Sequence, residues 1–168
     1  MMKIEKNFVF PVYIYDNTIR DIIALCKSIE NEIFGYLIGN ILKWKDNFYI
    51  VIEDLLFLLG AIHSEKYTTA QIEGTAGKYE KKFQRLKKAR NNPSLRILGW
   101  WHSHPDFGCF LSTTDVKTQS YFFPESYQVA LVIDPIRDEL EFFTLDNSSE
   151  KGYKPLSYAV LADKLNKI

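Results

Sequence analysis

The sequence has 168 residues with 21 basic and 21 acidic side chains, so its formal net charge is zero. A balanced charge gives no reason to expect a nucleic acid or an anionic membrane as partner. Only two cysteines occur, Cys26 and Cys109, which favours a reducing compartment. The amino-terminal residues lack a long apolar signal segment, and the longest apolar run, residues 55–62, is too short to cross a bilayer. We therefore expect a cytoplasmic protein with a single domain over residues 1–168.

The first part of the chain predicts a strand followed by a helix. Residues 8–15 are rich in β-forming side chains and contain Pro11, which suits an edge strand or the first residues of a strand. Asp16 or Asn17 is expected to cap the following helix, because apolar side chains then recur at helical spacing. These side chains are Ile19, Ile22, Ile23, Cys26 and Ile29.

The rest of the chain continues to mix the two kinds of element. Residues 60–77 have no clear periodicity and predict an irregular loop. Strands are predicted over residues 33–38, 48–53, 95–101, 128–133 and 139–145, and helices over residues 77–89, 113–122 and 157–165. This mixture predicts an α/β or α+β fold with a central mixed β-sheet flanked by helices.

The most informative pattern places His102, Ser103, His104 and Pro105 directly after a predicted strand, with Asp115 at the start of the next helix. Zinc binds imidazole nitrogens and carboxylate oxygens, and a catalytic zinc site uses three protein ligands plus water. Residues i and i+2 of a strand face the same side, so His102 and His104 can converge on one ion. Asp115 would then supply the third ligand.

Each part of this pattern also has an ordinary structural interpretation. Two half-buried histidines at a strand end occur without any metal. Ser112 and Asp115 match a capping box, in which an N-cap serine and an acid three residues later bond to each other's backbone. The two interpretations are compatible, because the start of a helix fixes the direction of both side chains.

The combined pattern resembles the MPN/JAMM zinc metallopeptidases. Residues 102–115 (HSHPDFGCFLSTTD) are similar to the metal-binding stretch of that family. Residues 32–39 (EIFGYLIG) resemble the family's Glu-x-x-Gly-x-Leu-x-Gly element. Residues 129–135 resemble its next core strand, and residues 151–155 resemble a further family segment. The resemblance therefore covers most of the chain and implies the MPN/JAMM fold, which is cytidine-deaminase-like.

The resemblance also implies a role for each site residue. It implies zinc (Zn2+) ligands at His102, His104 and Asp115, a general acid/base at Glu32 and an oxyanion-stabilising hydroxyl at Ser112. The implied activity is zinc-dependent cleavage after the C-terminal tail of ubiquitin or a ubiquitin-like protein. The implied partners are such a conjugate as substrate and either a second MPN subunit or another copy of this chain.

Two other functions remain consistent with the same motif. One is processing of the tail of a small sulfur-carrier protein, for which the zinc site would be identical. The other is a non-catalytic MPN scaffold, which the intact ligand set disfavours. A deaminase-like zinc enzyme would need a Pro-Cys-x-x-Cys arrangement, which the sequence lacks.

Several residues around the motif carry expectations of their own. Cys109 is expected to be buried rather than nucleophilic, because both nearby histidines serve as ligands. Asp106 and Phe110 stand where close relatives in this family tend to have Gly and Trp, and Asp106 would add a carboxylate beside the site. His63 lies in the irregular stretch of residues 60–77, which we expect to gate the site or to order on substrate binding.

Overall fold

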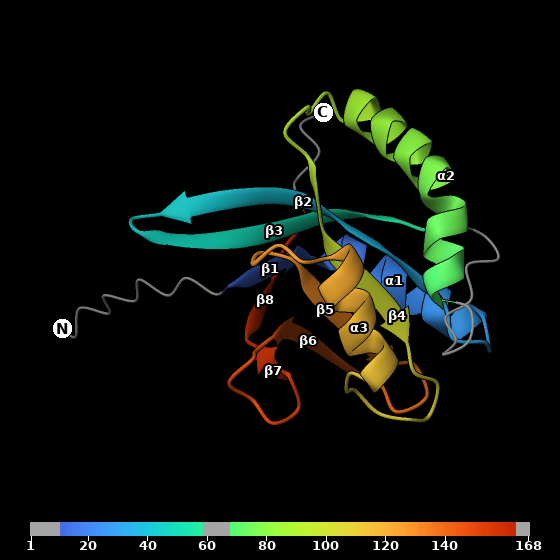
Figure 1. The fold of residues 1–168 in the computed structure, drawn as a ribbon. Helices are drawn as coiled ribbons and strands as arrows, with labels where there is room; N and C mark the ends of the chain where they lie inside the picture. The colour runs from blue at the N-terminus through green and yellow to red at the C-terminus, as the bar shows by residue number, and fades with distance from the viewer. Residues whose placement is uncertain (1–10, 59–67, 164–168) are drawn as a thin grey trace.

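The computed structural model describes the backbone of residues 11–58 and 68–163, and the side chains of residues 11–58 and 75–163. Its centre is an eight-stranded sheet with the strand order β7-β6-β5-β4-β2-β3-β1-β8 (Figure 1). The strands are β1 (Val12–Tyr15), β2 (Phe34–Trp44), β3 (Asn47–Leu56), β4 (Arg96–Ser103), β5 (Val129–Asp134), β6 (Glu139–Leu145), β7 (Tyr153–Leu156) and β8 (Tyr158–Leu161). The helices are α1 (Asp16–Ser28), α2 (Thr68–Ala89) and α3 (Thr113–Phe122).

The sheet is mixed, as the sequence predicts. Three neighbouring pairs are parallel, namely β1 with β3, β1 with β8 and β4 with β5. The other four neighbouring pairs are antiparallel. The predicted class, a central mixed sheet flanked by helices, is therefore confirmed.

The helices cover the two faces of the sheet with two separate apolar cores. Helix α1 buries Ile19, Ile22 and Cys26 against one face. On the other face, α2 contributes Tyr79 and Phe83 to a second core, and α3 lies in front of the same face (Figure 1). Burying each large apolar side chain stabilises the fold by about 1.5–3 kcal/mol. In the described residues, no helix combines the length and the apolarity needed to cross a bilayer.

A glycine in β2 and a glycine in β4 permit close packing in the middle of the sheet. A Cβ atom at Gly35 would collide with the carbonyl oxygen of Leu56 and with the indole ring of Trp101. Gly99, which lies opposite Leu37, has a φ of +137° that favours glycine. The pairing of β2 with β4 shifts register immediately beside this position. Gly35 thus allows β2 to approach β3 and β4, and Gly99, where a Cβ atom would collide with Val129, allows β4 to approach β5.

Strands β2 and β3 extend beyond their neighbours as a long hairpin (Figure 1). Strand β4 pairs with β2 only from Phe34 to Gly39, and β1 pairs with β3 only at residues 50–52. Among the described residues, no strand pairs with the outer edges of this hairpin. Its outer half exposes large apolar side chains, namely Leu42, Trp44 and Phe48.

The first predicted helix is confirmed, and the side chain of Asn17 accepts the Thr18 N–H at 2.8 Å, but neither Asp16 nor Asn17 is the N-cap residue. Helix α1 begins at Asp16 with Tyr15 as its N-cap residue, and no side chain of the N-cap position bonds to the helix. The Asn17 N–H donates instead to the carboxylate of Asp163, at 2.8 Å. An acceptor from the far end of the chain therefore satisfies a helix-terminal N–H, which the local sequence could not reveal.

Helix α2 begins earlier than predicted. Residues 60–77 were expected to form a loop, but residues 68–77 belong to α2, while residues 60–67 and His63 lie outside the described residues. Gly77 weakens the helical pattern at a cost of about 1 kcal/mol relative to alanine. A side chain there would meet nothing within 4 Å. The helix is stabilised further along, where Tyr79 and Phe83 are buried.

The predicted last helix, over residues 157–165, is wrong. Residues 158–161 form β8, which pairs in parallel with β1 from Val12 to Tyr15. The ring of Tyr158 packs against Phe142, with 5.1 Å between ring centroids. Main-chain bonds to a strand about 146 positions earlier decide this conformation, so local periodicity was misleading.

Candidate metal centre

Strand β4 and the residue that follows it carry the two histidines toward the face that α3 covers. His102 lies between Phe34 of β2 and Val132 of β5, and both of these residues belong to the core on that face. His104 follows the end of β4, but its N–H still donates to the carbonyl of Ile133, at 2.9 Å. Strand geometry therefore continues one residue past β4, and both imidazoles project to the same side.

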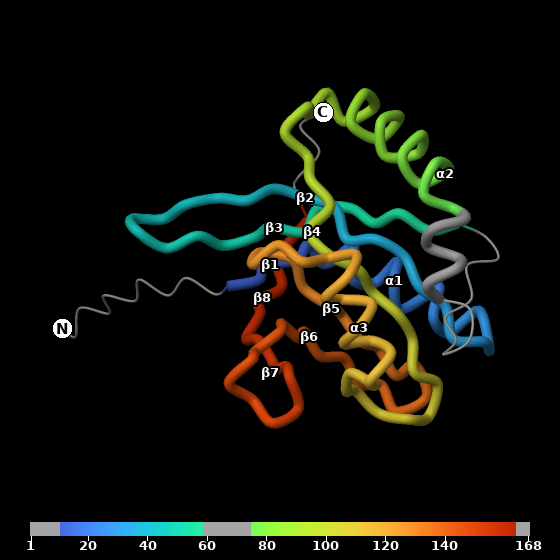
Figure 2. The backbone as a smooth tube through the Cα atoms, viewed as in Figure 1, coloured from blue at the N-terminus to red at the C-terminus, as the bar shows by residue number. Residues whose placement is uncertain are grey.

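Asp115 reaches the histidines from the first turn of α3. Figure 2 shows the chain leaving β4, turning through the loop of residues 104–111 and entering α3 beside the strand. The predicted capping box is present: the Asp115 N–H donates to Ser112 Oγ at 3.2 Å, and the Ser112 N–H donates to Asp115 Oδ2 at 2.7 Å. The box holds the Asp115 carboxylate in a fixed direction, with the side chain wholly buried.

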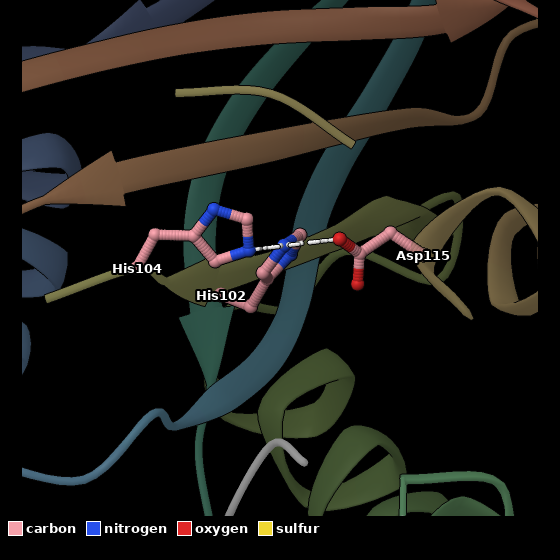
Figure 3. Close-up of side chains that lie close together, drawn as sticks. All are labelled: His102, His104 and Asp115. Carbon is pink, nitrogen blue, oxygen red and sulfur yellow. Dashed lines mark hydrogen bonds and ion pairs between the residues drawn. The ribbon is translucent and has the colours of Figure 1, made fainter. Parts of the chain in front are cut away.

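The three side chains meet with the spacing of ligands around one ion (Figure 3). His102 Nε2 and His104 Nε2 lie 3.2 Å apart. Asp115 Oδ2 lies 3.5 Å from His102 Nε2 and 3.6 Å from His104 Nε2. Ligands about 2.0–2.1 Å from a tetrahedral ion are separated from one another by about 3.3–3.4 Å. The donor atoms and their spacing thus fit a tetrahedral divalent metal such as zinc.

The surroundings of His104 define its ring orientation and its proton affinity. Its Nδ1 lies 3.2 Å from the carbonyl oxygen of Gly108, an acceptor that requires the ring proton on Nδ1 and leaves Nε2 to face the other two side chains. Burial lowers the pKa of His104, but the hydrogen bond and charge of Asp115 outweigh it and raise that pKa above the usual value. The Gly108 carbonyl and the charge of Glu32 act in the same direction.

Glu32 lies beside this cluster because of the pairing of β2 with β4. The next residue, Ile33, accepts a hydrogen bond from the N–H of Ser103 and donates its own N–H to Ser103 Oγ, both at 3.0 Å. Ser103 stands between the two histidines in the sequence, so these bonds hold Glu32 near the pair. Its half-buried carboxylate is close enough to affect His104 electrostatically.

Comparison with known proteins agrees with this arrangement. A family model described as the JAB1/Mov34/MPN/PAD-1 ubiquitin protease matches residues 12–125. The chain belongs to this MPN/JAMM family. The matched region includes the three clustered side chains together with Glu32 and Ser112.

Relatives of this chain include one named as a complex subunit and one named as a ubiquitin hydrolase. The chain is 36% identical to COP9 signalosome complex subunit 5 of Debaryomyces hansenii over 127 residues, which cover 70% of this chain and 25% of the relative. It is 29% identical to ubiquitin carboxyl-terminal hydrolase RPN11 of Saccharomyces cerevisiae over 123 residues, covering 68% of this chain and 37% of the relative. The chain thus spans between 25% and 37% of the length of these relatives.

A solved structure shares the fold of this MPN/JAMM chain. A protein of Desulfitobacterium hafniense, determined in solution, matches with a TM-score of 0.59 and 16% sequence identity. The match covers 90% of this chain and 94% of the other. At this identity the likeness concerns the fold.

The other residues singled out near the MPN/JAMM motif lie outside the cluster of His102, His104 and Asp115. Cys109 is half-buried, and burial raises the pKa of its thiol to about 11, so the thiol is protonated at neutral pH. Asp106 does not direct its carboxylate into the site, because Oδ1 accepts from Arg137 Nε at 3.1 Å and the side chain is largely exposed. Its φ of +66° lies in the left-handed region that favours glycine. Phe110 packs its ring against His104, with centroids 4.8 Å apart.

Gln119 and Asp134 are buried polar residues near the MPN/JAMM site for which the sequence predicts no role. The indole of Trp100 stacks on His102, with centroids 4.3 Å apart, and its Nε1–H donates to Gln119 Oε1 at 2.7 Å. Asp134 is wholly buried at the end of β5 and accepts hydrogen bonds from the loop that carries Gly108. The sequence signals for Asp134 are its place directly after a predicted apolar strand and its inclusion in residues 129–135, which resemble a family segment.

Proposed function

We propose that this chain is a zinc-dependent metallopeptidase that cleaves the peptide or isopeptide bond after the C-terminal tail of ubiquitin or a ubiquitin-like protein. The observation that carries the proposal is the buried triangle of His102 Nε2, His104 Nε2 and Asp115 Oδ2, with edges of 3.2–3.6 Å. Family membership, and a relative named as a ubiquitin hydrolase, support the substrate class.

The three clustered residues are the proposed zinc ligands. Their two imidazoles and one carboxylate match the ligand types of catalytic zinc sites. A buried carboxylate also requires compensation by positive charge, which a divalent ion provides. Bound zinc supplies Lewis acidity, which polarises a substrate carbonyl and makes water reactive near neutral pH.

Glu32 is the proposed general acid/base. Its carboxylate lies beside His104, at the end of the site that the pairing of Ile33 with Ser103 holds in place. From there it can take a proton from the attacking water and pass it to the leaving amine.

Ser112 is the proposed oxyanion stabiliser. Its Oγ accepts the Asp115 N–H, so its own hydrogen stays available for a substrate oxygen.

Metal content is the first part of the test. Wild-type protein is expected to contain close to one zinc per chain, and the double variant His102→Ala/His104→Ala is expected to contain almost none. The third histidine of the chain, His63, provides a matched control, and His63→Ala is expected to keep its zinc. Elemental analysis of purified proteins measures this directly. Wild-type protein free of zinc after purification and zinc supplementation would remove the metallopeptidase proposal.

Cleavage of a panel of fusions is the second part of the test. The panel joins ubiquitin, ubiquitin-like proteins and a small sulfur-carrier protein to a reporter. Wild-type protein is expected to cleave at least one ubiquitin or ubiquitin-like fusion, and Glu32→Gln is expected to reduce this rate by at least about 100-fold with zinc retained. Glu30→Gln, an exposed neighbour, is the matched control and should cleave normally. Cleavage of the sulfur-carrier fusion alone would change the substrate class, and cleavage of none would favour a scaffold.

A further inference from the structure

Asp134 is a buried carboxylate that no step of the proposed reaction uses. It ends β5, its side chain is wholly buried, and both of its oxygens accept hydrogen bonds from main-chain N–H groups. Oδ1 accepts from Asp106 at 3.0 Å, from Ile136 at 3.0 Å and from Arg137 at 3.1 Å. Oδ2 accepts from the N–H of Gly108 at 2.7 Å. Arg137 Nε also lies 3.5 Å from Oδ2.

These bonds connect two loops. One loop follows β4 and contains Asp106 and Gly108, and the other follows β5 and contains Ile136 and Arg137. Asp106 and Gly108 have φ values of +66° and +78°, a left-handed region that needs support from the surroundings. A carboxylate that accepts one N–H from each of these two residues provides this support.

Gly108 is the residue through which Asp134 reaches the metal centre. Its N–H donates to Asp134 Oδ2, and its carbonyl oxygen lies 3.2 Å from His104 Nδ1. The orientation of that carbonyl determines the orientation of the imidazole, and the orientation of the imidazole determines where Nε2 points. Groups that bond to the second nitrogen of a metal-binding histidine in this way typically contribute about 10–100-fold to metal affinity.

We infer that Asp134 is a positioning residue for the metal centre: through Gly108, it holds His104 in the orientation that binds the ion. The inference rests on the proposed zinc site. Asp134 touches neither substrate nor metal in this arrangement, so its contribution should appear in metal affinity before any turnover is measured.

The substitution Asp134→Asn separates this role from general support of the loops. An amide that keeps its oxygen at the Oδ1 position retains three acceptor contacts, but its NH2 group cannot accept the Gly108 N–H. The affinity of purified protein for zinc is measured by competition with a chromogenic chelator. The absorption spectrum of the cobalt-substituted protein reports the geometry of the ligands. Because Asp134 acts one residue removed from His104, Asp134→Asn is expected to bind zinc up to about 10-fold more weakly and to show an altered cobalt spectrum.

Asp146→Asn is the matched control. Asp146 also accepts a main-chain N–H and a hydroxyl in a turn, both from Ser148, but it lies in the β6–β7 connection. This variant is expected to keep the zinc affinity and cobalt spectrum of the wild type. Thermal unfolding of the chelator-treated proteins shows whether each variant is folded at the temperature of the binding assay.

The outcomes distinguish this inference from the proposed function. A folded Asp134→Asn variant with wild-type zinc affinity and an unchanged cobalt spectrum would overturn the role of Asp134 and leave the zinc site intact. A wild-type protein unable to bind zinc would overturn both. Should Asp134→Asn fail to fold, Asp134→Glu replaces it, because this variant keeps the charge and moves both acceptors by one methylene. It is expected to weaken zinc binding as well, and wild-type affinity in this variant would equally overturn the inference.

Discussion

Gln119 is a buried residue near His102, and both the oxygen and the nitrogen of its side-chain amide form hydrogen bonds. It is 1% exposed, its Oε1 accepts the indole N–H of Trp100, and its Nε2 donates to the carbonyl oxygens of Phe123 and Gln128, at 3.2 and 3.1 Å. Trp100 in turn stacks on His102. The amide therefore fixes the indole on which one of the proposed metal ligands rests.

Replacing Gln119 with leucine tests how much this amide stabilises the fold. The variant keeps a similar volume but leaves a buried indole N–H and two carbonyl groups without their partner. Each buried polar group left unsatisfied costs about 1–3 kcal/mol, so Gln119→Leu is expected to lower the free energy of unfolding by about 2–4 kcal/mol. Urea unfolding at neutral pH measures the change.

A second glutamine provides the control for this prediction. Gln84 on α2 is exposed, and its side-chain amide donates to the carboxylate of Glu80, one helical turn away. Gln84→Leu is expected to change stability by no more than about 0.5 kcal/mol. Equal effects of the two substitutions would show that the amide of Gln119 is replaceable.

At the scale of elements, one serine at the start of α3 has an observed structural role and a proposed catalytic role. Ser112 caps the helix through its Oγ, and it is also the proposed oxyanion stabiliser. Ser112→Ala removes both functions, whereas Ser112→Asn replaces the hydroxyl with an amide that is itself a favourable N-cap.

The two variants should therefore differ in stability and agree in turnover. With chelator present to exclude any metal contribution, Ser112→Ala is expected to lose about 1 kcal/mol of unfolding free energy, while Ser112→Asn remains close to wild type. Both are expected to lose about 100-fold or more in the cleavage rate of the preferred fusion. Full turnover by Ser112→Ala would exclude the hydroxyl from the reaction, whereas full turnover by Ser112→Asn alone would show that an amide N–H replaces it.

The elements also show which features the sequence could predict. Helix α3, β6 and the strand that leads to His102 were predicted almost to the residue, because alternation and capping are local patterns. The i, i+2 spacing predicts that His102 and His104 share a face, and the combined motif adds Asp115 through its family resemblance; the three side chains lie together in the structure. Strand β8 was mistaken for a helix, because its conformation depends on pairing with β1 at the opposite end of the chain.

The roles of Asp134 and Gln119 depend on contacts of the same long-range kind. Asp134 bonds to Gly108, which lies 26 positions earlier, and Gln119 bonds to Trp100, which lies 19 positions earlier. Neither spacing is a periodicity of a helix or a strand, so no pattern in the sequence marks these contacts.

At the scale of the whole molecule, both cores bury weakly acidic groups in their neutral forms. Burial raises the pKa of Cys26, in the core beneath α1, from 9.0 to about 12. Burial also raises the pKa of Tyr36, in the opposite core, from 10.0 to about 12. The pKa of Tyr79, which stacks on Tyr36, is raised further by burial and by the charge of its neighbour.

The fold is therefore expected to lose stability in alkaline solution. Above about pH 9 the unfolded chain releases these protons while the folded chain retains them, so the unfolded state gains in stability. Each group contributes about 1.4 kcal/mol per pH unit once the pH exceeds its unfolded pKa. The effect begins with Cys26 and steepens above pH 10 as the tyrosines join it. Urea unfolding measured from pH 7.5 to 10.5 checks this expectation.

Removing the thiol isolates its part of the alkaline effect. Cys26→Ala is expected to be less stable than wild type at pH 7.5 but to show a flatter dependence between pH 9 and 10, because one titrating group is gone. A wild-type unfolding free energy that stays constant up to pH 10.5 would contradict the assignment of these groups as buried and neutral.

The long β2–β3 hairpin implies a gradient of rigidity along individual strands. The inner part of β2 pairs with both β3 and β4, and it begins at Phe34, which follows Glu32 and Ile33 and pairs with His102. The outer part has β3 as its sole strand neighbour among the described residues. Backbone amides should thus be strongly protected from solvent exchange near Phe34 and progressively less so toward Trp44. One continuous strand would then be rigid where it adjoins the site residues and flexible at its outer end, which can bend without displacing them.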